Sequence, residues 1–194
     1  MLNNKWTLQK LFQFLAFLAM FIVMPALSWY YLRGGRAMRR EALAELKDFG
    51  KIPAFELTDI NGQPFSEKLL AQKTVIFNFP KNAQAPLKTE LLAQFDNRDD
   101  IKFVSFYADS LSKVKQFFLS NFPKGNSHWT PIVEPADRFF ANKMAQTAAA
   151  SNIPMENLYA LADTNSVIRR FYDGTNRSDM VRLVQQIALI MPPK

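Results

Sequence analysis

The sequence predicts an α/β domain, in which helices flank a central mixed sheet, joined to an N-terminal transmembrane helix. Two observations carry this prediction. Strand-like and helix-like segments alternate from residue 51 onward, which is typical of a sheet with helices on both faces. Residues 11–32 form 22 residues without a charge, and about 20 suffice to cross a membrane.

The predicted strands share an enrichment in Val, Ile, Phe and Tyr and are bounded by turn residues. They cover residues 54–58, 74–79, 101–108, 158–162 and 167–172. Asn61-Gly62 marks a turn after the first strand. Residues 101–108 are almost all apolar, which favours a central strand that is buried on both faces.

Helical periodicity and composition predict the remaining elements. We expect helices over residues 85–95, 111–121, 136–149 and 178–191, and a juxtamembrane helix over 36–49 that ends near Gly50. Asp109 or Ser110 can cap the second of these, because a side-chain oxygen there can accept from free helix N–H groups. The expected domain organisation is a tail at 1–10, the transmembrane helix at 11–32, a helical stalk at 33–50 and the domain at 51–194.

The order of the predicted elements is strand, strand, helix, strand, helix, helix, strand, strand, helix. The last two strands are close enough to form a hairpin through residues 164–166. A sheet of this kind that ends in a hairpin and a helix has the thioredoxin topology, so the fold class is α/β, thioredoxin-like.

The net charge of +7 belongs to the flanks of the apolar segment. Six basic residues and no acid lie within residues 1–40, which leaves the rest nearly neutral. This distribution argues against nucleic-acid binding, which needs a basic face on the folded domain. Residues 29–31, Trp-Tyr-Tyr, suit the membrane interface. A cleavable signal peptide is the alternative, with residues 26–28 as its cleavage site.

Four arginines follow the segment and two lysines precede it, so the positive-inside rule favours a cytoplasmic domain, although the two lysines weaken the contrast. Within the segment, Gln13 and the small residues Ala16 and Ala19 can face another helix. Met20 and Met24 are four residues apart and share a helical face.

The sequence has no cysteine and one histidine, His128. Disulfides, thiol nucleophiles and thiolate metal ligands are therefore excluded within the chain, as is a metal site built from several of its own histidines. We predict no catalytic, cofactor-binding or metal-ligating residue.

Four stretches resemble the Sco/SenC proteins of the thioredoxin superfamily. They are residues 52–65 (IPAFELTDINGQPF), 73–79 (KTVIFNF), 104–109 (VSFYAD) and 161–165 (LADTN). The resemblance implies a thioredoxin-like fold over about residues 50–190 and a membrane-anchored factor for cytochrome c oxidase assembly. It also implies that the domain lies on the periplasmic or intermembrane-space side, whereas the charge pattern alone favours the cytoplasm. The orientation in the membrane therefore stays open, because the resemblance and the charge pattern imply opposite sides.

The chain departs from that family where the chemistry would be. Family members carry two cysteines after the first core strand. Those places fall near Asn82 and near Ala85 or Pro86. The family's copper-binding histidine falls near Met155, and His128 lies in another loop. Copper(I) prefers thiolate, thioether or imidazole ligands, so the resemblance implies the fold without the thiol or copper chemistry.

Three further features have a structural and a functional interpretation. Asp96, Asp99 and Asp100 form an acidic cluster, which we interpret as a solvated loop. Residues 176–178 (Asn-Arg-Ser) match a glycosylation triplet but favour a helix cap. Ile153-Pro154 is either the cis-proline that thioredoxin folds place beside their active site or a trans-proline in a loop.

These observations favour a redox-inactive binding or assembly factor of a respiratory membrane complex, with cytochrome c oxidase as the partner that the resemblance implies. The alternative is a structural accessory subunit of another membrane complex, with the anchor as its main contact. A copper-binding protein or an enzyme that works without cysteine is the third hypothesis, but no acid–base pair marks such a site. No small-molecule substrate can be identified.

Overall fold

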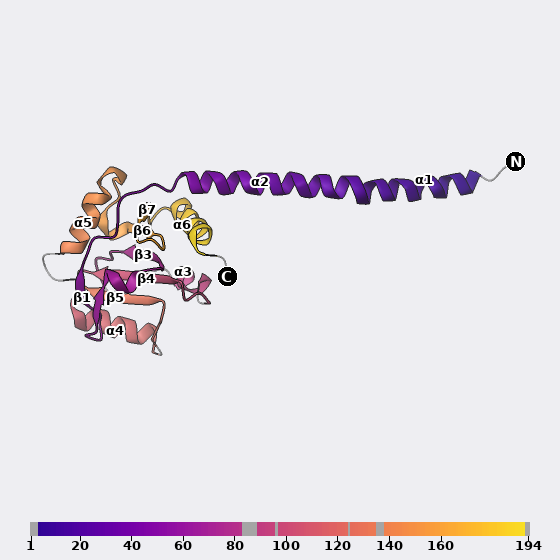
Figure 1. Cartoon of the computed structure of the whole chain (residues 1–194). Coiled ribbons are helices and arrows are strands. Elements are labelled where there is room, and N and C mark those ends of the chain that lie inside the picture. The colour runs from indigo at the N-terminus through magenta and orange to yellow at the C-terminus, as the bar shows by residue number, and fades with distance from the viewer. Residues whose placement is uncertain (1–3, 83–88, 96, 124, 135–137, 193–194) are drawn as a thin grey trace. The chain divides into compact units, whose positions relative to one another are not determined.

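The structure is a computed structural model that describes residues 4–82, 89–95, 97–123, 125–134 and 138–192. The chain divides into two compact units, Met1–Leu43 and Ala44–Lys194. The first unit is helical and the second contains the sheet (Figure 1).

The first unit consists of α1 (Asn4–Leu18), a π-helical turn η1 (Ala19–Val23) and α2, which ends at the boundary (Met24–Ala44). Among the described residues, one helical stretch is long and apolar enough to cross a membrane, Lys10–Arg33, with a mean hydropathy of 2.1. Its 24 residues rise about 36 Å, more than the roughly 30 Å of a hydrocarbon core. The side chains of this stretch are exposed within the chain, as a lipid-facing helix requires.

The second unit has a five-stranded mixed sheet in the order β5-β4-β3-β6-β7. Its strands are β3 (Thr74–Asn78), β4 (Ile101–Tyr107), β5 (Trp129–Val133), β6 (Leu158–Ala162) and β7 (Ile168–Asp173). The first three run parallel, whereas β6 pairs antiparallel with both β3 and β7. A separate hairpin joins β1 (Glu56–Thr58) to β2 (Pro64–Ser66).

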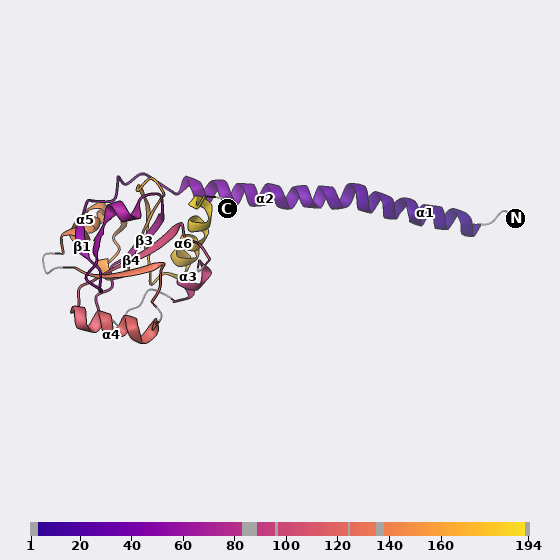
Figure 2. The ribbon, with the colours of Figure 1, turned by 60° about the horizontal axis from the view of Figure 1, so that its bottom comes forward.

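Helices cover both faces of this sheet, and Figure 2 shows α4 and α5 on opposite sides of it. One face packs against α5 (Phe139–Thr147) and the β1–β2 hairpin. The other packs against α3 (Thr89–Gln94), α4 (Leu111–Asn121) and α6 (Arg177–Ile190). The short 3-10 turns are η2 (Glu67–Leu70), η3 (Ala149–Ser151) and η4 (Met155–Asn157).

Phenylalanine rings fill the core between the sheet and α5. Phe106 of β4 and Phe140 of α5 stack with ring centroids 4.4 Å apart. Phe55, Phe77 and Phe79 surround this pair with centroid distances to Phe140 of 4.8, 5.5 and 6.1 Å. Because these rings are buried and interlocked, this cluster fixes α5 against the sheet.

Two strands of the structure, β5 and β2, were not predicted from the sequence. The predicted order has no element at Trp129–Val133, yet β5 there pairs along β4. This strand was not predicted because it contains Pro131, and proline is disfavoured inside strands. In the structure β5 is an outer strand of the sheet, where the missing N–H of a proline is tolerated. The short strand β2 was also not predicted.

The helix predicted over residues 36–49 is wrong after Ala44, where α2 ends. The segment that follows lies along β7 instead. Phe49 donates its N–H to Ile168, which donates back to Gly50, at 3.0 and 2.9 Å. Glu45 adds a side-chain contact there, since it pairs with Arg170 and, at 3.1 Å, with Arg182. Tertiary pairing therefore overrides the helical composition of this segment.

Of the two predicted helix caps, one is confirmed. Asn176 is the N-cap of α6, and its Oδ1 accepts from the Ser178 N–H at 2.9 Å. Ser110 is the N-cap of α4 but makes no side-chain cap bond, and Asp109 accepts from the Ser110 N–H outside the helix. Ser110 is thus the N-cap residue, as predicted, but its own hydroxyl does not supply the predicted cap bond.

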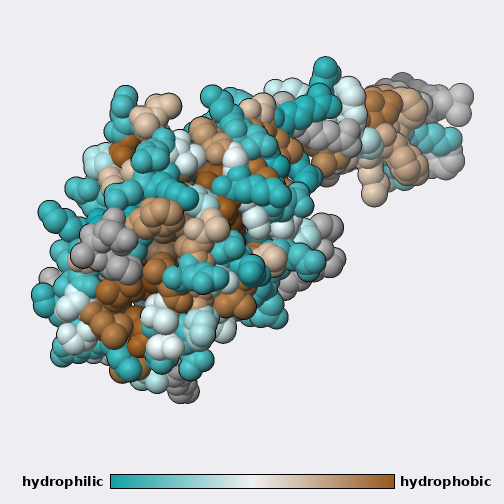
Figure 3. Space-filling view, turned by 60° about the vertical axis from the view of Figure 1, so that its left-hand side comes forward, coloured by the Kyte–Doolittle hydropathy of each residue, from teal (hydrophilic) through white to brown (hydrophobic). Residues whose placement is uncertain are grey.

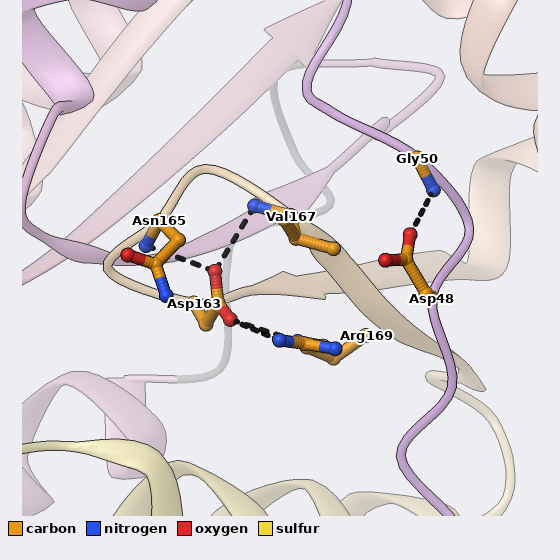
Figure 4. A network of polar contacts seen from close by, with 6 residues as sticks. All are labelled: Asp48, Gly50, Asp163, Asn165, Val167 and Arg169. Atoms are coloured by element: carbon orange, nitrogen blue, oxygen red, sulfur yellow. Dashed lines mark hydrogen bonds and ion pairs between the residues drawn. The ribbon is translucent and has the colours of Figure 1, made fainter.

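Asp163 shapes the predicted hairpin between β6 and β7, which the structure confirms (Figure 4). Its Oδ1 accepts from the N–H groups of Asn165 and Val167 at 2.9 and 3.0 Å. Its Oδ2 accepts from Arg169 Nε at 2.8 Å. Because both oxygens are committed to the turn and its ion pair, the sequence-predicted strand-to-turn step at residues 161–165 has a structural role.

We predict that Phe140→Ala lowers the free energy of unfolding by about 3–5 kcal/mol, because it opens a cavity among packed rings. The matched control is Phe139→Ala, because Phe139 is the exposed neighbour of Phe140. Among the described residues, its one aromatic or cation–π contact is with the Lys143 ammonium. The control should cost about 1 kcal/mol or less. Urea unfolding of the full chain in non-ionic detergent, followed by tryptophan fluorescence, measures both. Equal losses for the two variants would contradict this packing.

Candidate functional site at the end of strand β3

The place that the sequence predicts for the site lies directly after β3. The strand is fully buried, and Phe79 and Pro80 continue it into the interior. Lys81 and Asn82 then reach the surface. Asn82, the expected place of the first family cysteine, is thus exposed, whereas Ala85 and Pro86 lie outside the described residues.

The register of β3 against β6 brings a second loop to the same place. Asn78, the last residue of β3, pairs with Tyr159 near the start of β6. The chain reaches β6 from Pro154 through η4, so the loop before β6 adjoins the end of β3. The Ile153–Pro154 peptide bond is trans, since no described peptide bond is cis. This decides the question that the sequence left open.

A buried chain of polar side chains lies under the end of β3. Ser105 Oγ donates to Asn78 Oδ1 at 2.5 Å and accepts from Trp129 Nε1 at 2.7 Å. These three residues come from β3, β4 and β5, and each is almost completely buried. Hydrogen bonds between fully buried groups are directional, so the chain ties the end of β3 to β4 and, through the Trp129 side chain, to the start of β5. This polar chain was not predicted from the sequence, although polar Asn78 and Ser105 stand in two otherwise largely apolar strands.

Tyr107 lies at the end of β4 on the same face of the sheet and is fully buried. Burial raises the pKa of its hydroxyl. That hydroxyl makes no hydrogen bond to any described residue. A phenol with a raised pKa stays neutral at physiological pH, so Tyr107 is unsuited to act as a base.

The other predicted candidates lie away from this place or serve packing. Met155 packs against the hydrophobic core. His128 precedes β5, and its carbonyl accepts from the Phe103 N–H at 2.7 Å. Phe103 is near the start of β4, so His128 lies at the edge of the sheet opposite to the end of β3. The described residues contain no group of three His, Cys, Asp or Glu side chains placed to hold a metal ion.

One described carboxylate of the acidic cluster is engaged in an ion pair. Asp100 accepts from Arg98 Nε at 2.7 Å, and the two side chains form a salt bridge. Asp99 is exposed, and Asp96 lies outside the described residues.

A pocket of about 460 Å³ opens beside β1 and the start of α5. Phe55, Phe139 and Phe140 line it together with Glu67 and Glu134. Figure 3 brings this side of the domain forward and shows hydrophobic surface between hydrophilic patches. Glu134 directly follows β5, and parallel strands end at one edge of a sheet, so the pocket and the end of β3 share that edge. Ligands of α/β sheets bind at such edges.

No family model and no curated protein matches the sequence. Solved structures do match. BsSco, a member of the Sco family of cytochrome c oxidase assembly proteins, has a TM-score of 0.51 at 14% identity, over 71% of this chain and 93% of that one. A thiol:disulfide interchange protein of the thioredoxin family from Chlorobium tepidum has a TM-score of 0.52 at 12% identity, over 75% and 98%. The chain has a thioredoxin-like fold.

A SCO1/SenC family lipoprotein from Bacillus anthracis has a TM-score of 0.50 at 18% identity, over 71% of this chain and 95% of that one. The structural neighbours therefore include Sco/SenC proteins, as the sequence resemblance implied. They confirm the predicted thioredoxin-like fold class. The chain itself has no cysteine, in contrast to what thiol–disulfide exchange requires.

We predict that the free energy of unfolding falls above about pH 10, because folding raises the pKa of the Tyr107 and Tyr172 hydroxyls. A raised folded pKa contributes stability that is present below the unfolded pKa of about 10 and is lost as the pH rises toward the folded value. Urea unfolding between pH 8 and 11 measures the slope, and Tyr107→Phe should reduce it.

The two tyrosines should differ at pH 7. Tyr172 donates to Gln186 Oε1 at 2.5 Å, so Tyr172→Phe should cost about 1–2 kcal/mol. Tyr107→Phe removes a buried hydroxyl without a described partner and should cost less than about 1 kcal/mol or stabilise the fold. A larger loss for Tyr107→Phe than for Tyr172→Phe would contradict this assignment.

Proposed function

We propose that this chain is a membrane-anchored, redox-inactive thioredoxin-fold protein that serves as a binding or assembly factor of a respiratory membrane complex, with cytochrome c oxidase as the first candidate. The observation that carries the proposal is a thioredoxin-like fold in a sequence without a single cysteine. Disulfide exchange needs a thiolate at the end of β3, and this chain supplies none. The end of β3 can still offer a surface for binding.

That surface suits binding to a partner chain. The exposed residues after β3, the loop before β6 and the pocket beside α5 share one edge of the sheet. The buried polar chain holds the end of β3, which is one part of this edge, in place. A preordered surface loses less conformational entropy when it binds.

The link to cytochrome c oxidase rests on the likeness to BsSco, which is described as a member of an oxidase assembly family. The helix Lys10–Arg33 supports a membrane location. We propose that it stays attached as a single-pass anchor and that the domain lies on the periplasmic or intermembrane-space side. The chain then acts without a cofactor of its own and is not an enzyme.

Purification of the full chain in a mild detergent tests the partner. We expect subunits of cytochrome c oxidase to co-purify in a fixed ratio, because the anchor and the domain edge both reach a membrane complex. The control is the chain without residues 1–33, which should lose most of the bound complex. Quantitative mass spectrometry measures the ratio. Stoichiometric recovery of a different complex would refute the oxidase assignment and favour an accessory subunit of that complex.

Copper titration tests the proposed absence of metal chemistry. We expect no stoichiometric endpoint when copper(I) is added to the full chain against a competing chelator, since the chain offers no thiolate and its one histidine lies far from Met155 in the sheet. A Met155→Leu variant should behave identically. A saturable one-to-one endpoint that Met155→Leu removes would overturn this part of the proposal.

A further inference from the structure

The π-helical turn in the anchor deprives the Met20 carbonyl of its usual backbone donor. In an α-helix the Met24 N–H would bond to the Met20 carbonyl, but here it bonds to Ala19. The residue that could reach Met20 across a π turn is Pro25, which has no N–H. The proline therefore accounts for both the widened turn and the unpaired Met20 carbonyl.

This carbonyl lies near the middle of the apolar stretch. Met20 follows Lys10 by ten residues and precedes Arg33 by thirteen, which places it about 15 Å and 20 Å from the two ends of the span. Water does not reach that depth, and lipid tails have no donors. An unpaired carbonyl there is costly unless another protein group satisfies it.

The chain cannot supply that donor. Residues 16–24, Ala-Phe-Leu-Ala-Met-Phe-Ile-Val-Met, contain no side-chain donor. Gln13 is seven residues away and Ser28 eight, or about 10 and 12 Å along the axis. A second copy of the chain inserted in the same direction presents the same donor-free residues at this depth. It therefore cannot pair with the Met20 carbonyl either.

We propose that this face of the anchor docks against a transmembrane helix of a different protein, which presents a hydroxyl, amide or indole donor at mid-membrane depth. Ala16 lies four residues before Met20 on the same face. Its small side chain allows a close approach of two backbones. The proposal rests on the proposed membrane anchoring and specifies where the partner complex binds.

Photo-crosslinking in the native membrane tests the docking. In one variant a photoreactive residue replaces Met24, which directly follows the widened turn. In the other it replaces Ile22, which is two residues before Met24 and on the opposite side of the helix. We expect Met24 to crosslink to one membrane protein other than this chain, through a peptide that contains a donor side chain, and Ile22 not to do so. Crosslinks from both positions alike, or only to a second copy, would overturn the proposal.

Pro25→Ala in the same background restores the missing N–H. We expect it to weaken the Met24 crosslink between about threefold and fifteenfold, the range for one hydrogen bond between membrane helices. Leu27→Ala is the control, because it leaves the number of backbone donors unchanged, and should have no effect. A Met24 crosslink that persists unchanged in Pro25→Ala refutes the role of the carbonyl.

The outcomes separate this inference from the proposed function. If a respiratory complex co-purifies but Met24 gives no crosslink, the docking face is wrong and the proposed function stands. If Met24 crosslinks through a donor-bearing helix that belongs to no respiratory complex, the docking face stands and the proposed function fails.

Discussion

The pairing of β3 on both of its edges is the constraint on which the rest of the domain depends. The strand pairs parallel with β4 and antiparallel with β6, and Val75, Ile76 and Phe77 are fully buried. A strand held on two edges and two faces cannot shift by one residue without exposing its apolar side chains. Its end is therefore fixed, and with it the point where the chain leaves the sheet toward Asn82.

The outer strands of the sheet have backbone neighbours of their own. The segment after Ala44 lies along β7, where Lys47 donates its N–H to the Arg169 carbonyl at 2.9 Å. A bridge between Asp59 and Ile132 covers part of β5. A partner that adds a strand needs unpaired backbone groups at a sheet edge. These contacts occupy such groups at both edges, so recognition through loop and pocket side chains suits this domain better.

Local patterns predicted the central elements well, because β3, β4 and α4 follow the period of a buried strand or an amphipathic helix. Residues after Ala44 were mistaken for helix, since Glu45 and Lys47 favour helices in isolation and only the distant strand β7 gives the segment its extended form. Strand β5 was missed because Pro131 disfavours a strand locally, whereas the pairing with β4 forms one there. The position of the candidate site followed from the end of β3, but the bonds among Asn78, Ser105 and Trp129 join strands far apart in the sequence and have no local signature.

That buried polar chain also explains how the edge can stay ordered without thiol chemistry. Each of its hydrogen bonds adds only about 1 kcal/mol, yet removal of one member leaves the others buried without a partner at about 1–3 kcal/mol each. The end of β3 is thus held by groups that take no part in redox chemistry. A chain without cysteine therefore keeps contacts that shape this edge of a thioredoxin-like sheet. A fixed edge of this kind supports the binding role that we propose, because an ordered surface loses less conformational entropy on binding.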